Sequence, residues 1–508
     1  MIVAERLYWR NVLQAGLVLT FVFLVVFLAF CNLSGFPEFL ALDEGFRLYF
    51  IKHVVRYGRW AILTQDGFHA YWRDSTGPVV LLPIMALFAL FEPSLILARS
   101  VMGALLVLGT LIVYRSMRDW YDSRIALLAV WLWLFFGPPW LNTVTMGRWV
   151  YGELPALGFF ILGCWRWSRA ATGSSRAMVV AWIAFVLAVW SKDLFAPMIV
   201  ATLTIVWLAH RHEYLARSFL IVPSLLCIAA FALWSGFQIV MSWAAGVTAT
   251  GQYDLLQLSL SRIIVFSPTL WWNNLKFLYE HNLLVVFPLA LYALAVRPPR
   301  RVGSELLIVF VLIWMAWYAG GSIGWPRYAY PIWAIGGILL AVALGDLMEW
   351  TRNQLVCSQH RPTKLALVAL VISILIIVLV WPAQNTVRRV FEPVDTAAIT
   401  MATYIDANVP PVERIVSGQW EVHMYSDRLF IPIPEEYYAV KIAEQIGKTL
   451  ELPAMRSITD LQATYLLDGS ENRVVEMEPP DRLHMWYEPV FQVGTYCLYR
   501  LKRFPDDR

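Results

Sequence analysis

The chain has 508 residues, of which 59% are hydrophobic and 15% are charged, and its formal net charge is +4. This composition excludes an ordinary soluble fold and indicates a protein that crosses a membrane many times. The 25 Trp and 22 Tyr residues suit such a protein, because amphipathic rings accumulate at membrane–water boundaries. The sequence contains no motif for binding nucleic acid.

Long apolar runs predict the spanning helices, since about 20 apolar residues cross a bilayer. The first run ends in LAFC at Cys31, but Phe30 is too bulky for a lipoprotein cleavage site, so we interpret the run as an uncleaved signal anchor. Eleven segments are predicted to span the membrane: 13–33, 97–114, 125–141, 154–167, 177–191, 194–209, 218–241, 282–296, 304–319, 328–347 and 365–382.

One further apolar run, 78–91 (PVVLLPIMALFALF), decides the orientation. Basic residues favour the cytoplasmic side of short loops. If this run does not span, every basic loop lies in the cytoplasm; if it spans, every later loop changes side. We therefore predict that 78–91 lies in or dips into the outer interface, with the N-terminus inside and the C-terminus outside. The basic loops carry Arg6 and Arg10; Arg115, Arg118 and Arg124; Arg166, Arg169 and Arg176; Arg211 and Arg217; Arg297, Arg300 and Arg301; and Arg352, Arg361 and Lys364.

The outer face is then predicted to hold loops at 34–96, 142–153 and 242–281 and a polar tail at 384–508. The tail alternates β-like runs (ERIVSGQ, RLFIPI, ATYLLDG, TYCLYRLKR) with helical segments (DTAAITMATYIDANV, YAVKIAEQIG). That alternation indicates a small soluble α/β domain. The predicted architecture is a polytopic α-helical membrane domain at 1–383, with external juxtamembrane helices, followed by an external α/β domain at 384–508.

The first loop opens with two adjacent carboxylates, Asp43 and Glu44, at the start of a predicted helix, DEGFRLYFIKHVVRYG. Carboxylates are favoured at a helix N-terminus, so capping is one explanation for the pair. Catalysis is the other, because both lie outside the membrane beside basic and aromatic residues that suit a phosphate and a sugar. The helix is amphipathic, and its basic face is predicted to lie against anionic lipid headgroups. The apolar face carries Leu48, Ile51 and Val55, and the basic face carries Arg47, Lys52, Arg56 and Arg59.

The segment LDEGFRLYFIKHVVRYGRWAI resembles the first external loop of the GT-C glycosyltransferase superfamily, and most of all that of protein O-mannosyltransferases and lipid A aminoarabinose transferases. These families share a first span, an external Asp-Glu pair on a juxtamembrane helix and a later GxW sequence. The resemblance covers most of the chain in order. The further matching positions are Gly58–Trp60 for GxW, Glu153 with Pro155 at the start of a span, Lys192 after a later span, and Arg327, Tyr328 and Pro331 for RYxxP.

The resemblance implies transfer of a sugar from a polyprenyl-phosphate carrier at the outer membrane face. Such chemistry needs a base near the acceptor hydroxyl and cations near the departing phosphate. Asp43 is the predicted general base, with capping or an ion pair to Arg47 as the alternative. Glu44 is predicted to orient Asp43, to bind sugar or to cap the helix. Glu153 is predicted as a second catalytic acid, with a favourable helix start as the alternative.

A second group of residues is predicted to bind the substrate or the donor phosphate. Arg327 suits this task because Arg meets a phosphate through two parallel hydrogen bonds and stays charged when partly desolvated. Lys192 lies between two spans with almost no loop, so a snorkelling Lys in an interfacial turn is the alternative. No metal site is predicted, because Glu280 and His281 alone are too few ligands, and the need for a divalent cofactor stays open. The predicted set is Arg327, Tyr328, Lys192, Arg73, Arg148 and His69.

The predicted function is a glycosyltransferase, hexosyl or pentosyl, of the bacterial inner membrane. Its partners would be a polyprenyl-phosphate-sugar donor, membrane lipids, and a cell-envelope glycan, lipid or protein as acceptor, with the tail in the periplasm. Two alternatives stay open: a ligase or polymerase of lipid-linked glycans, and a transporter or flippase. Transporters usually place ionisable residues mid-membrane and often show repeated halves. Here the acids lie at predicted outer span ends and the sequence shows no repeat, which favours the enzyme.

Overall fold

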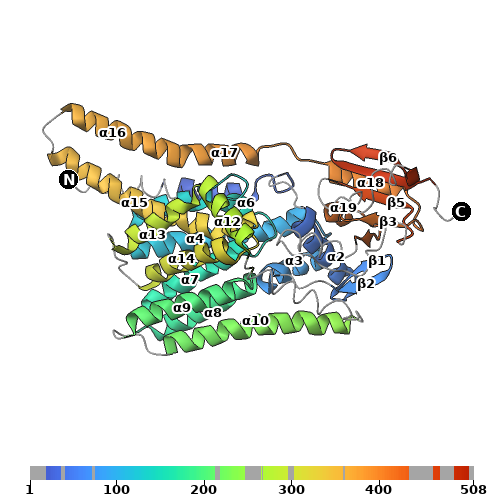
Figure 1. The fold of residues 1–508 in the computed structure, drawn as a ribbon, viewed down its shortest axis with the longest axis horizontal. Coiled ribbons are helices and arrows are strands. Elements are labelled where there is room, and N and C mark those ends of the chain that lie inside the picture. Colours follow the sequence, from blue (N-terminus) through green and yellow to red (C-terminus); the bar gives the residue numbers. More distant parts are fainter. Residues whose placement is uncertain are drawn as a thin grey trace.

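The computed structural model describes residues 16, 19–35, 41–70, 75–211, 218–245, 265, 267–295, 302–357, 361–433, 461–469 and 485–502. Most of the described chain is helical, and the helices pack side by side into an elongated bundle with a smaller, sheet-containing part at one end (Figure 1). The bundle contains α4 (Leu95–Trp120), α5 (Ser123–Phe135), α6 (Thr143–Met146), α7 (Glu153–Ala170), α8 (Ser175–Ser191), α9 (Phe195–His210), α10 (Ser218–Ala244), α12 (Pro268–Glu280), η2 (Leu283–Val285), α13 (Val286–Ala295), α14 (Val302–Gly321), η3 (Pro326–Ala329), α15 (Tyr330–Cys357), α16 (Arg361–Leu375), η4 (Ile376–Val380) and α17 (Trp381–Val390).

Within the described residues, five helices are long and apolar enough to cross a membrane, or six if α12 and η2–α13, which meet at 83°, count as one bent span. Each of the eleven predicted segments contains a helix, but some helices are short: α5 has 13 residues and α9 has 16. The chain is therefore a multi-pass helical membrane protein, and the number of eleven spans stays a prediction.

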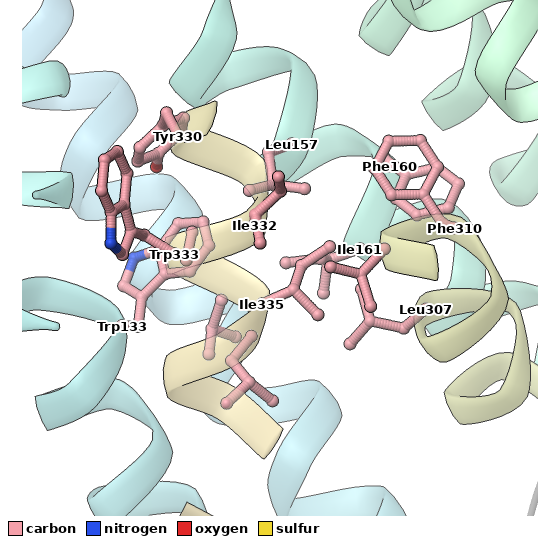
Figure 2. Packing of buried hydrophobic residues seen from close by; sticks show 14 of the residues in the cluster. Trp133, Leu157, Phe160, Ile161, Leu307, Phe310, Tyr330, Ile332, Trp333 and Ile335 are labelled. Atoms are coloured by element: carbon pink, nitrogen blue, oxygen red, sulfur yellow. The ribbon is translucent and has the colours of Figure 1, made fainter. Parts of the chain in front are cut away.

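Large apolar side chains from α5, α7, α14 and α15 form the core of the bundle (Figure 2). Phe160 of α7 lies against Phe310 of α14, with ring centroids 4.1 Å apart. Where α7 and α14 meet, a glycine lets the backbones approach, since a Cβ on Gly303 would lie 2.1 Å from the carbonyl oxygen of Cys164. This packing fixes the ends of the helices, where the polar residues of interest lie.

Three short elements lie between the bundle and the sheet: α2 (Phe46–Tyr57), the hairpin of β1 (Ala61–Thr64) and β2 (Gly67–Ala70), and α3 (Pro78–Leu90) (Figure 1). Gly58 ends α2 in the left-handed conformation, with φ 66°, which glycine adopts without strain. Helix α3 occupies the apolar run 78–91 and packs against α2 and α4. Its predicted place in the outer interface stays a prediction.

The tail forms a five-stranded sheet in the order β4-β3-β5-β7-β6. Strand β3 runs parallel to β4 and β5, and β7 runs antiparallel to β5 and β6. All its described elements except β6 and α19 lie in runs predicted as strand or helix, and the helix predicted at 438–447 lies outside the described residues. The elements are α18 (Ala397–Asn408), β3 (Ile415–Ser417), α19 (Trp420–Tyr425), β4 (Ile431–Pro432), β5 (Tyr465–Asp468), β6 (Tyr487–Val493) and β7 (Tyr496–Leu501).

The basic face of α2 meets the tail domain. Lys52 Nζ donates to the carbonyl oxygens of Met424 at 3.2 Å and Ser426 at 2.9 Å. Arg56 Nη1 lies 3.2 Å from Oδ1 of Asp427. Two of the four basic residues of this face therefore have partners in the tail domain, and the prediction that the face lies against lipid headgroups stays a prediction.

The last long helix passes the predicted domain division at 383/384. Elements α16, η4 and α17 follow one another without a break from Arg361 to Val390. The end of this helix is tied to the turn that follows the first described helix, Leu19–Phe30. There Asn32 Nδ2 donates to the carbonyl oxygen of Val390 at 2.9 Å. The compact part of the tail begins after this helix, with α18.

Candidate active site

The adjacent acidic residues lie on one turn of π-helix, η1 (Ala41–Gly45), immediately before α2. Such turns are rare and are frequently found at functional sites. The turn sends the two side chains into different surroundings: Glu44 is fully buried, whereas the Asp43 side chain is 29% exposed. The two carboxylates therefore have different partners.

Glu44 forms a two-pronged ion pair with Arg99 of α4. Arg99 Nε donates to Oε1 at 3.0 Å and Nη2 donates to Oε2 at 2.7 Å. The backbone N–H of Val150 also donates to Oε1, at 3.2 Å, and Arg99 Nη1 donates to the carbonyl oxygen of Leu33 at 2.9 Å. A buried ion pair is tolerated only when its remaining hydrogen-bonding groups are satisfied, as they are here. Glu44 thus joins three segments of the chain.

Asp43 contacts Arg327, a residue far away in the sequence that lies just before α15. The Arg327 guanidinium pairs with Oδ2 of Asp43, and the Tyr151 hydroxyl donates to the same oxygen at 3.4 Å. Arg47 Nη2 lies 3.9 Å from Oδ1, while its Nη1 donates to the carbonyl oxygen of Val150 at 3.0 Å. The predicted base and the predicted phosphate ligand are therefore direct neighbours.

Arg327 lies in η3, the short turn before α15, and aromatic rings surround it. Its guanidinium carbon lies 4.5 Å from the ring centroid of Trp325 and 5.4 Å from those of Tyr151 and Tyr328. Its side chain is 13% exposed. Ring faces attract a partly desolvated cation, so they hold the charge where it remains accessible to a ligand.

A second ion pair links the other predicted acid, Glu153, to Lys192. Lys192 Nζ lies 3.0 Å from Oε1 of Glu153, and both side chains are 1% exposed. Glu153 begins α7 and Lys192 follows α8, and the two segments approach closely because a Cβ on Gly152 would lie 1.9 Å from the carbonyl oxygen of Ser191. Lys192 also forms an isolated antiparallel bridge with Thr76.

Of the other predicted residues, Arg148 is described with different partners, whereas the side chains of His69 and Arg73 lie outside the described part of the chain. Arg148 is fully buried and its guanidinium donates to the carbonyl oxygens of Leu28, at 3.2 Å, and Cys31. His69 pairs through its backbone in β2, and its side chain lies outside the described part of the chain. Arg73 also lies outside the described residues.

In the part of the chain that the structure describes, no group of three or more His, Cys, Asp or Glu residues is placed to hold a metal ion. The acid and imidazole considered from the sequence have other contacts. Glu280 lies 3.6 Å from Lys276, and the His281 ring stacks on Phe277 with centroids 4.1 Å apart.

The sequence gives no site role to Arg99 or Tyr151, and it predicts Arg47 as part of a basic stripe and as an alternative ion-pair partner of Asp43. Arg99 does carry a signal, because it is a charged residue inside the apolar run SLILARSVMGALL, where a charge is costly unless it has a partner. Tyr151 lies two residues before Glu153, but aromatic residues are common at membrane boundaries, so its position is not distinctive.

The tail domain packs directly on the turn that carries the acids. A Cβ on Gly45 would lie 2.8 Å from the backbone nitrogen of Glu421, at the start of α19. The Phe46 and Trp420 rings meet edge to face, with centroids 4.9 Å apart. The position of η1 therefore depends on both the bundle and the tail.

A buried histidine, His53, lies in the same interface. Its Nδ1 accepts a hydrogen bond from the backbone N–H of Leu63 at 2.9 Å. Burial, followed by the positive charges of Lys52 and Arg56, lowers the pKa of His53 to about 3. Burial likewise lowers the pKa of His423 in α19. Both imidazoles are therefore neutral where α2 meets the tail.

A bundle of apolar helices, with a polar site at its end and an α/β domain packed on that site, defines a class of multi-pass membrane protein with an appended α/β domain. Solved structures share this fold. ArnT from Cupriavidus metallidurans bound to undecaprenyl phosphate is 13% identical, with a TM-score of 0.64, and the match covers 96% of this chain and 97% of that chain. The apo state of ArnT gives 14% identity, a TM-score of 0.65, and coverage of 96% and 98%.

The archaeal oligosaccharyltransferase AglB from Archaeoglobus fulgidus, in complex with an inhibitory peptide and a dolichol-phosphate, is also similar. It is 14% identical, with a TM-score of 0.55, and the match covers 96% of this chain and 74% of that chain. ArnT and AglB are both members of the GT-C superfamily, so the chain has a GT-C fold and the predicted resemblance is confirmed at the level of the fold. No family model matches the chain, and no curated protein matches it by sequence.

Proposed function

We propose that this protein is a membrane glycosyltransferase that moves a sugar from a polyprenyl-phosphate-linked donor to a cell-envelope glycan, lipid or protein. The observation that carries the proposal is the contact between Asp43, a partly exposed carboxylate, and Arg327, a cation held among aromatic rings. The likeness in fold to ArnT bound to undecaprenyl phosphate and to AglB bound to a dolichol-phosphate adds support.

The proposed reaction needs one base and one anion-binding group. Asp43 takes the proton of the acceptor hydroxyl, whose oxygen forms the new bond to the anomeric carbon of the sugar. The bond between that carbon and the phosphate oxygen breaks, and polyprenyl phosphate leaves with the electron pair. Arg327 binds this phosphate more tightly as its charge grows, which stabilises the transition state.

The contact between Asp43 and Arg327 has one further property that fits this reaction. Arg327 pairs with the same oxygen of Asp43 that would otherwise receive the proton. A donor phosphate that takes Arg327 leaves that oxygen available to the acceptor. The donor is therefore expected to bind before the acceptor is deprotonated.

The other acids take supporting roles in this proposal. Glu44 pairs with Arg99 and thereby holds η1 in place. Glu153 pairs with Lys192 and fixes the position of that cation at the start of α7. We place the site on the outer face of the bacterial inner membrane, with the N-terminus in the cytoplasm and the tail outside, as the basic loops predict.

Replacement of the base tests the proposal. Asp43→Asn keeps the shape of the side chain and removes its capacity to accept a proton, so transfer should fall by about 10²- to 10⁴-fold while the protein still inserts and folds. Transfer is measured as undecaprenyl phosphate released from synthetic donors, in nanodiscs supplied with cell-envelope extract. The matched control is Asp66→Asn, because Asp66 lies on the same loop and forms an ion pair with Arg414 in which both side chains are over a third exposed. Transfer by Asp43→Asn close to that of the control would sink the assignment.

The likeness to AglB favours a second candidate, the transfer of a whole glycan from the lipid. Donors that carry one sugar on a monophosphate, and donors that carry an oligosaccharide on a diphosphate, separate the two. Turnover of the first kind alone supports a monosaccharide transferase, and turnover of the second kind alone supports a glycan ligase.

A further inference from the structure

Tyr151 touches the groups proposed to act, through both its hydroxyl and its ring. The hydroxyl donates to Oδ2 of Asp43 at 3.4 Å, and the guanidinium carbons of Arg47 and Arg327 lie over the ring, 5.0 and 5.4 Å from its centroid. The residue is 2% exposed. We propose, on the basis of the proposed function, that Tyr151 is a positioning residue: it keeps Asp43 oriented for proton transfer after the donor phosphate has drawn Arg327 away.

The backbone around Tyr151 is held firmly enough for this task. Its neighbour Val150 donates its N–H to Glu44 and accepts from Arg47 at its carbonyl oxygen. The Tyr151 N–H donates to the carbonyl oxygen of Trp149 at 2.7 Å. Tyr151 therefore cannot shift without disturbing the buried Glu44 ion pair, and its hydroxyl has a defined position.

The ring gives the two arginines different tasks. Arg47 is 3% exposed and also donates to a backbone carbonyl, so it is bound to the protein itself. Arg327 is held by the Asp43 carboxylate and by ring faces, which a phosphate can compete with. When Arg327 turns to a phosphate, Asp43 keeps Arg47 at Oδ1 and Tyr151 at Oδ2. Tyr151 then supplies the remaining hydrogen bond to the oxygen that receives the proton.

The test uses the full chain in nanodiscs with undecaprenyl phosphate esterified to a hexose, a pentose or an amino sugar, and with cell-envelope extract as the source of the acceptor. Release of undecaprenyl phosphate gives kcat and KM, and native mass spectrometry gives binding of undecaprenyl phosphate itself. Tyr151→Phe keeps the ring and loses the hydroxyl, so kcat should fall about tenfold while the donor KM stays unchanged. The acidic limb of the pH–rate profile of Tyr151→Phe should move to higher pH, because the Asp43 carboxylate has lost a hydrogen bond that favours its charged form. Tyr151→Leu also loses the ring, so kcat should fall further and the donor KM should rise.

The control is Tyr279→Phe, since Tyr279 is 72% exposed on α12. Wild-type kcat and an unmoved pH profile in Tyr151→Phe would overturn the positioning role and leave the proposed function intact. Equal losses in Tyr151→Phe and Tyr151→Leu, with a reduced melting temperature in both, would also overturn it in favour of a purely structural role. If the wild-type protein neither binds undecaprenyl phosphate nor releases it from any donor, the proposed function fails and this inference fails with it.

Discussion

Asp43 and Arg327 lie 284 positions apart in the sequence and share one contact in the fold. Glu44 and Arg99 form a fully buried ion pair that holds the fold together. Asp43 and Arg327 differ from them, because both of their side chains are partly exposed to solvent. A partly exposed ion pair contributes little to stability. The pair is thus better explained by binding and chemistry than by folding.

Arg327 should separate donor binding from turnover. Arg327→Ala is expected to lose both donor affinity and turnover, whereas Arg327→Lys should retain binding better than turnover, because Lys cannot form two parallel hydrogen bonds to a phosphate. Transfer rate against donor concentration, with binding of undecaprenyl phosphate measured alongside, checks this. The control is Arg56→Ala, which removes a cation in the last turn of α2 whose side chain is 54% exposed. Normal binding and turnover in Arg327→Ala would make Arg327 an interfacial anchor and move the phosphate site to Lys192 or Arg73.

The sequence identifies individual residues of the site but does not show which of them contact one another. Asp43, Glu153, Lys192 and Arg327 can all be found because they match, in order, the motifs of the family that the sequence resembles. That Arg327 pairs with Asp43, and Lys192 with Glu153, depends on how the helices pack. Arg148 shows the limit most clearly, because an Arg beside a predicted site serves backbone carbonyls of the first helix instead.

Helix α2 connects the bundle to the tail, with one side on α3 and the other on α19. Its basic residues contact Asp427 and the carbonyl oxygens that end α19, and the turn before it packs on the start of α19. Amphipathic patterning predicts such a helix, but it cannot tell a lipid surface from a protein surface, since both offer electron-rich oxygens. Strand β6 is harder still to predict, because Pro489 lies within it and proline is disfavoured inside strands.

Gly45 should be intolerant of any side chain. A Cβ at this position would lie 2.8 Å from the nitrogen of Glu421 and 2.9 Å from the backbone carbon of Trp420, so η1 or α19 must move. Gly45→Ala is expected to destabilise the protein by about 1–3 kcal/mol and to reduce transfer, because η1 carries Asp43. Thermal unfolding in detergent measures the first effect. Gly236→Ala in α10 is the control, as its added methyl meets nothing within 4 Å and should be neutral or stabilising. A melting temperature for Gly45→Ala equal to that of the control would contradict this packing.

His53 should make the contact between α2 and the tail sensitive to acid. Its pKa is lowered from 6.5 to about 3 in the folded protein, so the unfolded chain binds a proton at pH values where the folded chain does not. The stability linked to this group is fully present above about pH 6.5 and is lost as the pH falls toward about 3. Melting temperatures between pH 7 and pH 4 should therefore fall more steeply in the wild type than in His53→Gln, whose side chain does not titrate. Parallel curves would show that His53 does not carry the effect.

Orientation in the membrane belongs to the whole molecule. The basic loops predict that reporter fusions after Arg118, Arg301 and Lys364 report cytoplasm and that a fusion after Val394 reports the outside. A cytoplasmic signal after Val394 would mean that α3 crosses the membrane or that another span is miscounted. The same result would place Asp43 and the tail on different sides, which their packing forbids, so the fusion set also tests the fold.

Much of the architecture follows from composition and patterning. Apolar runs mark helices because backbone groups in lipid must be satisfied within the chain, and the alternation in the tail marks an α/β unit. The number of spans does not follow in the same way, because α5, α8 and α9 have 13, 17 and 16 residues, fewer than the roughly 20 that cross a bilayer, yet they pack within the bundle. The tilt and bend of a helix depend on the helices that pack against it, and one apolar run of sequence does not show which helices those are.

The end of the first helix has a consequence for biosynthesis. Two carbonyl oxygens there, that of Leu28 in its last turn and that of Leu33 in the turn that follows, are bonded by Arg148 and Arg99. The ribosome makes Arg99 only after α3 and Arg148 only after α5. A nascent chain that has inserted only its first helix must leave those oxygens to water. The acidic turn then acquires its final shape only when the segment around Val150 has been delivered to the same side of the membrane. Assembly of the site is therefore a late event of insertion, and a chain truncated before α7 should hold a first helix and an acidic pair but no organised site.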